Sequence, residues 1–228
     1  MAIELRFLER LVRTPTAVSY RFSRPPGFTF AAGQYMLLWP EPSGSLVHPL
    51  SLSDRPKEFL EFTKRMTGSA YCQALEGLRL GDTVMAKGPL GRFTAEGSGE
   101  ELVCIAGGIG ITPIRSILAE MAEQGDRRRI TLIYGNADET DIAFAEELAA
   151  LPLPQFRLVH VLQRPGSKLK AYAGFINTEI IRAEIPALAA ATVLVSGPPV
   201  MVKAVEAQLA KLGISPEQLR TDRFLGYA

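Results

Sequence analysis

Residues 102–121 constrain the fold more than any other stretch of this chain. They read Leu-Val-Cys-Ile-Ala-Gly-Gly-Ile-Gly-Ile-Thr-Pro-Ile-Arg-Ser-Ile-Leu-Ala-Glu-Met. The apolar run 102–106 is typical of a parallel strand buried on both faces, and apolar residues at helical spacing follow from Ile114. Thr112 suits a helix N-cap, and Pro113 suits the first turn, where a missing N–H costs nothing. The stretch predicts a strand, a glycine turn and a helix start, which together favour an anion such as a pyrophosphate.

The glycine pattern alone leaves two interpretations open. It reads G-G-x-G-x-x-P, and Pro113 stands where the common dinucleotide fingerprint has its third glycine. A glycine turn between a strand and a helix also occurs as plain architecture. The rest of the chain has to decide between a nucleotide site and a structural turn.

Charge and cysteine content narrow the class of protein. The chain has 228 residues, with 25 Lys and Arg against 24 Asp and Glu, and two cysteines, Cys72 and Cys104. Near-neutral charge gives no strong field for nucleic acid or an anionic membrane. Two cysteines cannot form a disulfide framework or ligate an iron–sulfur cluster through four thiolates. The sequence shows no signal peptide and no apolar run of the ~20 residues that a membrane helix needs, so we expect a cytoplasmic protein with no membrane span and no metal site.

The first part of the chain has the pattern of β-strands. Strands are predicted at residues 3–13, 17–22, 34–39, 46–53, 58–63 and 83–87, with Pro- and Gly-rich turns between them and one helix at 69–78. Several short strands at this spacing predict a closed antiparallel barrel.

The pattern changes after the polar stretch 95–100. Strands predicted at 102–106, 130–134, 157–161 and 192–196 alternate with helices predicted at 113–122, 141–148, 178–184 and 199–212. This alternation predicts a doubly wound parallel sheet. We therefore expect two domains, an antiparallel β-barrel over residues 1–97 and an α/β doubly wound parallel sheet over 98–228. Small-residue turns at 107–110, 135–136 and 197–199 follow strand ends, where such sheets bind ligands.

A series of motifs in order along the chain resembles the ferredoxin reductase-like flavoprotein family, of the ferredoxin–NADP reductase and cytochrome b5 reductase type. They are F-A-A-G-Q-Y at 30–35, H-P-L-S at 48–51, T-G-S at 67–69, G-P-L-G-R-F at 88–93, Y-G-N at 134–136 with D-I-A-F at 141–144, S-G-P-P-V-M at 196–201 and D-R-F at 222–224. The resemblance implies a flavin-binding barrel and an NAD(P)-binding domain. It also implies FAD, hydride transfer from NADH or NADPH to flavin N5, and a separate electron acceptor or carrier protein.

The flavin motif departs from the family pattern at two positions. The usual arginine is His48, as in ferric reductases, and the usual aromatic residue is Leu50. A largely neutral imidazole gives a phosphate at most one hydrogen bond, where arginine gives two. Leu50 cannot stack π on π with a flavin ring. Two alternatives follow: the flavin is held loosely, or these are plain barrel residues beside a degenerate pocket.

The resemblance assigns catalytic roles to four residues. Ser51 would hydrogen-bond near flavin N5, Asp222 would relay a proton, and Ser196, in place of the usual cysteine, would lie beside the nicotinamide. Tyr227 would cover the flavin as a gate. An exposed carboxylate without a role at Asp222 and a frayed tail at Tyr227 are the alternative interpretations.

The same resemblance gives a set of cofactor-binding residues. Lys64 is the predicted cation for a flavin phosphate, with a solvated strand residue as the alternative. The full set is His48, Pro49, Leu50, Ser51, Phe62, Lys64, Thr67, Gly68, Ser69, Gly107, Gly108, Ile109, Gly110, Thr112, Pro113, Tyr134, Gly135, Asn136, Gly197, Pro198, Pro199 and Met201.

The sequence leaves open the choice between NADH and NADPH and the class of function. Asp138 would repel a 2′-phosphate and favours NADH, whereas Arg164, Lys168, Lys170 and Tyr172 could bind that phosphate. An NAD(P)H:flavin reductase that uses flavin as a substrate is a second hypothesis. A non-catalytic electron-transfer or nucleotide-sensing subunit of a larger complex is a third.

Overall fold

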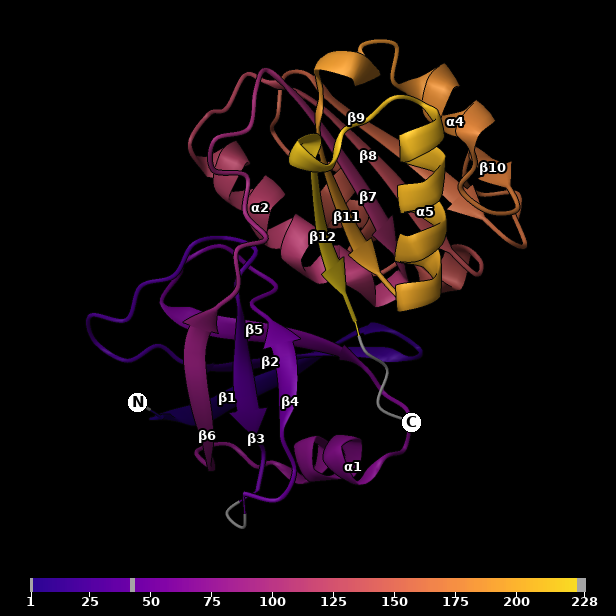
Figure 1. Cartoon of the computed structure of the whole chain (residues 1–228). Coiled ribbons are helices and arrows are strands. Elements are labelled where there is room, and N and C mark those ends of the chain that lie inside the picture. Colours follow the sequence, from indigo (N-terminus) through magenta and orange to yellow (C-terminus); the bar gives the residue numbers. More distant parts are fainter. Residues whose placement is uncertain (1, 42–43, 225–228) are drawn as a thin grey trace.

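The computed structural model describes residues 2–41 and 44–224, which form two six-stranded sheets one above the other (Figure 1). The first sheet is antiparallel, in the order β4-β3-β6-β1-β2-β5. Its strands are β1 (Ile3–Thr14), β2 (Ala17–Ser23), β3 (Tyr35–Trp39), β4 (His48–Ser51), β5 (Phe59–Arg65) and β6 (Thr83–Leu90). The helix α1 (Ala70–Gly77) lies between β5 and β6, and the Ser69 side chain caps it by accepting from the Cys72 N–H.

The antiparallel sheet closes on itself as the predicted barrel. Just beyond β4, Leu52 forms a β-bridge to Phe62 of β5, and the Ser53 N–H donates to the Glu61 carbonyl at 2.8 Å. Inward-facing side chains such as Phe7, Phe22 and Phe62 fill the barrel. Burying these aromatic side chains is the main driving force for closing the sheet.

The second sheet is parallel throughout, in the order β10-β9-β8-β7-β11-β12. Its strands are β7 (Glu101–Gly107), β8 (Arg129–Asn136), β9 (Phe156–Leu162), β10 (Ala171–Ala173), β11 (Thr192–Gly197) and β12 (Leu219–Arg223). Every residue of the central strand β7 is buried. The strand order reverses between β7 and β11, which places a ligand crevice outside the carboxyl ends of these two strands.

Helices cover both faces of the parallel sheet (Figure 1). On one face, α2 (Ile111–Glu123) and α3 (Ala145–Ala149) pack on Cys104 and Leu132. On the other, α4 (Thr178–Glu184) and α5 (Pro199–Lys211) pack on Val103 and Ile105. Within residues 2–41 and 44–224, no helix combines the length and the apolarity needed to cross a bilayer.

Several predicted boundaries are wrong. The cap of α2 is Gly110, because a short 3₁₀ turn over Gly108–Gly110 precedes the helix, and the Thr112 hydroxyl donates to the Ile109 carbonyl instead. The helix predicted at 141–148 begins only at Ala145, because Phe144 adopts a left-handed backbone with φ 62°. The strand predicted at 46–53 covers only His48–Ser51.

The edge strands β10 and β12 lie outside the predicted elements. β10 spans three residues, and β12 reads Leu-Arg-Thr-Asp-Arg, so neither has the apolar run of a buried strand. The segment 91–100 connects the two sheets, and the proposed domain boundary at 97/98 lies within it.

A cluster of buried ion pairs, here called the Glu61 cluster, joins the two sheets. The Glu61 carboxylate of β5 accepts from Arg13 at 3.0 Å, from Arg21 at 2.8 Å and from Arg115 of α2 at 2.8 Å. Arg115 also donates to the Ser53 carbonyl and pairs with Glu147 at 2.7 Å. Because Ser53 lies two residues after Ser51, the cluster fixes the H-P-L-S segment relative to the helix that follows the glycine turn.

Candidate functional site

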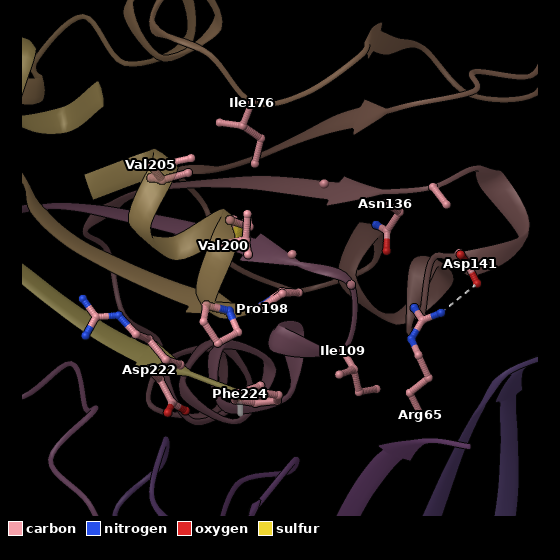
Figure 2. A pocket seen from close by; sticks show the side chains of 18 of the residues that line it. Arg65, Ile109, Asn136, Asp141, Ile176, Pro198, Val200, Val205, Asp222 and Phe224 are labelled. Carbon is pink, nitrogen blue, oxygen red and sulfur yellow. Dashed lines mark ion pairs between the residues drawn. The ribbon is translucent and has the colours of Figure 1, made fainter. Parts of the chain in front are cut away.

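A cavity of about 950 Å³ opens between the barrel and the carboxyl ends of β7, β8 and β11 (Figure 2). The barrel contributes Tyr35, residues 48–51, residues 63–65 and Thr67 to its lining. The parallel sheet contributes residues 107–109, 135–137, 198–201 and 222–224. The cavity is therefore lined jointly by the predicted flavin motif and the predicted nucleotide turns.

The glycine turn after β7 packs tightly on the turn after β11. A Cβ on Gly107 would lie 2.7 Å from Met201 Sδ, and one on Gly110 would lie 2.4 Å from the Ser196 carbonyl oxygen. The glycines therefore bring two strand-end backbones together where no side chain fits. Tyr134 supports the turn through its hydroxyl, which donates to the Gly108 carbonyl at 3.2 Å.

The barrel side of the cavity carries a stacked pair of rings. The His48 imidazole lies on the ring of Tyr71 from α1 with centroids 4.0 Å apart, and Lys64 Nζ lies 5.7 Å from the centroid of the same ring. Burial, followed by the charge of Lys64, lowers the pKa of His48 to about 4. His48 is thus neutral at physiological pH, and Lys64 is the nearby positive charge.

Two buried polar groups near the cavity have no hydrogen-bond partner among the described residues. Asn136 is 6% exposed and lines the cavity with both amide atoms unpaired, and the Ser196 hydroxyl is unpaired at the end of β11. Unpaired buried polar atoms cost free energy unless a ligand or water satisfies them. Together with the crowded glycines, this lining fits a polar nucleotide.

Asp222 of β12 pairs with Ser196 of β11 in the parallel ladder and lines the cavity. Burial raises the pKa of its carboxyl to about 6. With Tyr35, it also borders a second cavity of about 270 Å³. The carboxyl can therefore exchange a proton near neutral pH, as a relay group requires.

The predicted cofactor residues divide into two groups. Those that line the cavity are His48, Pro49, Leu50, Ser51, Lys64, Thr67, Gly107, Gly108, Ile109, Gly135, Asn136, Pro198, Pro199 and Met201. Those that do not are Phe62, Gly68, Ser69, Gly110, Thr112, Pro113, Tyr134 and Gly197. Several of the second group have structural contacts instead: Phe62 belongs to the barrel core, and Ser69 caps α1. Tyr227 lies outside the described residues.

Other cavity residues were missed by the sequence reasoning. Arg65 and Asp141 line the cavity as an ion pair with 3.6 Å between Nη1 and Oδ1. Phe175 and Val200 also line it, although these residues are 72% and 83% exposed. Arg65 follows Lys64 directly on β5, and because neighbouring strand residues point to opposite sides, the strand pattern predicts only one of the two at the cavity.

Comparisons with known proteins agree with this geometry. Residues 104–207 match the family model of the oxidoreductase NAD-binding domain. The chain is 30% identical over 223 residues to NADH-cytochrome b5 reductase 1 of Mycosarcoma maydis, covering 92% of this chain and 69% of the relative. It is 32% identical over 177 residues to NADH-cytochrome b5 reductase 2 of Homo sapiens, covering 68% of this chain and 64% of the relative.

A solved structure has the same overall fold. The Amycolatopsis cytochrome P450 reductase superposes with a TM-score of 0.85 at 25% identity, covering 98% of this chain and 70% of that one. This chain spans less than two thirds of the length of several curated relatives, including 62% of NADH-cytochrome b5 reductase 1 of Dictyostelium discoideum.

Proposed function

Because the chain belongs to the ferredoxin reductase-like family of oxidoreductases, we propose that it is an NAD(P)H-dependent flavoprotein reductase. It takes hydride from the coenzyme onto a flavin and passes electrons to a separate acceptor or carrier protein. One observation carries the proposal: the H-P-L-S strand and the glycine turn line one cavity from opposite sides. We also propose the domain limits 1–97 and 98–228, and a cytoplasmic location, which the two free cysteines favour.

The proposed cofactor is FAD. When bound, FAD supplies a ring that accepts hydride and releases electrons singly. Lys64 and Thr67 would hold its phosphates at the start of α1, and Leu50 would pack on its ring. The glycine turn and Asn136 would hold the coenzyme from the other side, with Ser196 near its nicotinamide.

Two side chains on the cavity wall are proposed to hydrogen-bond the flavin and to exchange a proton with solvent. The Ser51 hydroxyl would hydrogen-bond the flavin, and the Asp222 carboxyl would hold a proton or release it to solvent. This role for Asp222 is supported by its burial and by the raised pKa of its carboxyl, about 6. Closure of the cavity around both cofactors would exclude water from the hydride path.

Spectroscopy of the purified protein tests the proposal. We expect a yellow protein whose flavin absorbance bleaches when NADH is added under anaerobic conditions. Cofactor released by denaturation should run as FAD in chromatography, because the start of α1 suits a pyrophosphate. FMN alone would contradict the FAD assignment. Colourless protein that neither bleaches nor reduces added flavin would support the non-catalytic subunit hypothesis instead.

A flavin reductase with flavin as a dissociable substrate is the second candidate. The stacked, neutral His48 favours it, because the motif then contributes no positive charge to a flavin phosphate. Colourless protein that reduces added flavin at the expense of NADH would support this candidate over the first.

The substitution His48→Arg is expected to tighten flavin binding. An arginine can keep the planar stack on Tyr71 while adding a permanent charge and a fork of donors. We expect the flavin Kd to fall by about tenfold, as for one charge-assisted hydrogen bond. Fluorescence titration of apoprotein with FAD measures it. An unchanged or higher Kd would show that position 48 does not face the flavin phosphates.

We propose NADH as the preferred coenzyme. The Arg164 guanidinium donates to Asp138 Oδ2 at 2.8 Å, so one of the predicted cations for a 2′-phosphate already has a carboxylate partner. The kcat/KM for NADH should exceed that for NADPH by about tenfold or more. The substitution Asp138→Asn should lower this NADH-to-NADPH ratio, because it removes the carboxylate that repels a 2′-phosphate. A wild-type preference for NADPH would overturn this assignment.

A further inference from the structure

We propose that Asp141 is an internal counter-ion that the diphosphate of the coenzyme displaces from Arg65. The carboxylate would thereby set the affinity of this site for the coenzyme. The inference rests on the proposed function, because it concerns the same coenzyme site. It assigns Arg65, which no sequence motif includes, and Asp141, the first residue of the D-I-A-F motif, as opposing partners in one exchange.

The ion pair spans the two halves of the cavity (Figure 2). Arg65 ends β5 of the barrel, and Asp141 ends the short 3₁₀ turn after β8. Arg65 Nη1 lies 3.6 Å from Asp141 Oδ1, and Thr16 Oγ1 lies 3.3 Å from each of these two atoms. At 3.6 Å the guanidinium and carboxylate make no close bidentate bond, and the Arg65 side chain is 38% exposed. Such a pair is weak enough to exchange partners.

The Arg65 guanidinium already lies at the predicted pyrophosphate position. Its Nη2 atom would be 3.4 Å from a Cβ on Gly108, the residue at which the glycine turn adopts φ 51°. A diphosphate resting on this turn would therefore be within reach of the arginine with little movement. Arginine binds phosphate oxygens through two parallel hydrogen bonds, which a carboxylate at 3.6 Å does not match.

A second observation points to a ligand at the same place. Asn136 is the last residue of β8 and lies on the same wall of the cavity as Asp141 (Figure 2). It is more than nine-tenths buried, and both of its amide atoms are without a partner among the described residues. A diphosphate or ribose can accept from the amide nitrogen. The cavity thus offers a bound anion one neutral donor, Asn136 on the parallel-sheet side, and one cation, Arg65 on the barrel side, which has to leave Asp141.

Binding of ADP to the full-length protein tests the exchange, because ADP carries the diphosphate without the nicotinamide. Asp141→Asn keeps an oxygen for the Thr16 hydroxyl but removes the competing charge, and it should lower the Kd of ADP by about two- to fivefold. Arg65→Gln should raise the Kd by about tenfold or more, as expected for a lost charge-assisted bond. In the double variant, the gain from Asp141→Asn should disappear. Calorimetry at fixed ionic strength measures all four proteins.

Two controls separate charge exchange from a general disturbance of the cavity. Adenosine, which lacks the diphosphate, should bind all four proteins alike. Asp126→Asn removes a carboxylate paired with Arg128 away from the cavity, and it should leave the Kd of ADP unchanged. Equal shifts for adenosine and ADP, or an Asp141→Asn variant that binds ADP no better than wild type, would overturn the role of Asp141. If NADH still bleaches the flavin of the wild-type protein in that case, the proposed reductase function holds and only the displacement of Asp141 from Arg65 is wrong.

Discussion

Replacing Glu61 by glutamine is expected to lower the free energy of unfolding by about 3–5 kcal/mol, the cost typical of removing one partner from a buried ion pair. The Glu61 side chain is inaccessible to solvent and is shared by Arg13, Arg21 and Arg115. The Arg115 side chain is only 4% exposed, so its guanidinium cannot turn to water when the carboxylate is lost. A neutral amide leaves this cluster with an excess of buried positive charge.

The matched control is Glu9→Gln. Glu9 pairs with the same Arg21 at 2.7 Å, but its side chain is 49% exposed, and a surface pair of this kind contributes about 1 kcal/mol or less. Urea unfolding followed by circular dichroism compares the two variants without the charge screening that guanidinium brings. If Glu61→Gln shifted the midpoint no further than Glu9→Gln at equal slope, the cluster would not be what holds the two sheets together.

The Glu61 cluster could not be predicted from the sequence. Glu61 lies in a strand pattern where a charged residue normally faces water, and its partners are 40, 48 and 54 residues away along the chain. The packing of the barrel against the parallel-sheet half brings β5 beside α2 and places Arg115 against Glu61. The same holds for Arg65 and Asp141, whose pairing depends on how the two sheets face each other.

Local features were predictable where backbone chemistry decides them. The predicted strand 102–106 lies within β7, because a continuous apolar run favours a strand buried on both faces. The predicted glycine turn follows it and lines the cavity, because glycine leaves space for a close approach of the backbone. The helix predicted at 178–184 has the same bounds in α4, whose cap Asn177 accepts from the Ile180 N–H. Edge strands and the left-handed Phe144 escaped prediction, because tertiary contacts rather than local propensity fix them.

The substitution Gly110→Ala is expected to weaken coenzyme binding by about tenfold or more. The backbone of Gly110 is right-handed, with φ −60° and ψ −7°, so an alanine suffers no torsional strain there. The added Cβ would instead lie 2.4 Å from the Ser196 carbonyl oxygen, and 2.5 and 2.6 Å from Gly197 Cα and N. These are backbone atoms at the end of β11, which cannot move aside as a flexible side chain can. This steric clash can be relieved only if the glycine turn moves away from the turn after β11.

Overpacking of this kind costs about 1–3 kcal/mol of stability, and a shift of the turn should weaken NADH binding by about tenfold or more. Gly99→Ala is the matched control, because its Cβ would meet nothing closer than the Ala190 carbonyl oxygen at 4.0 Å. Urea unfolding gives the stability of both variants, and NADH titration under anaerobic conditions gives the affinity. The flavin Kd should stay near wild type in both, since the barrel side of the cavity is untouched. A Gly110→Ala protein that binds NADH as tightly as Gly99→Ala would mean that the coenzyme does not depend on the contact between these two turns.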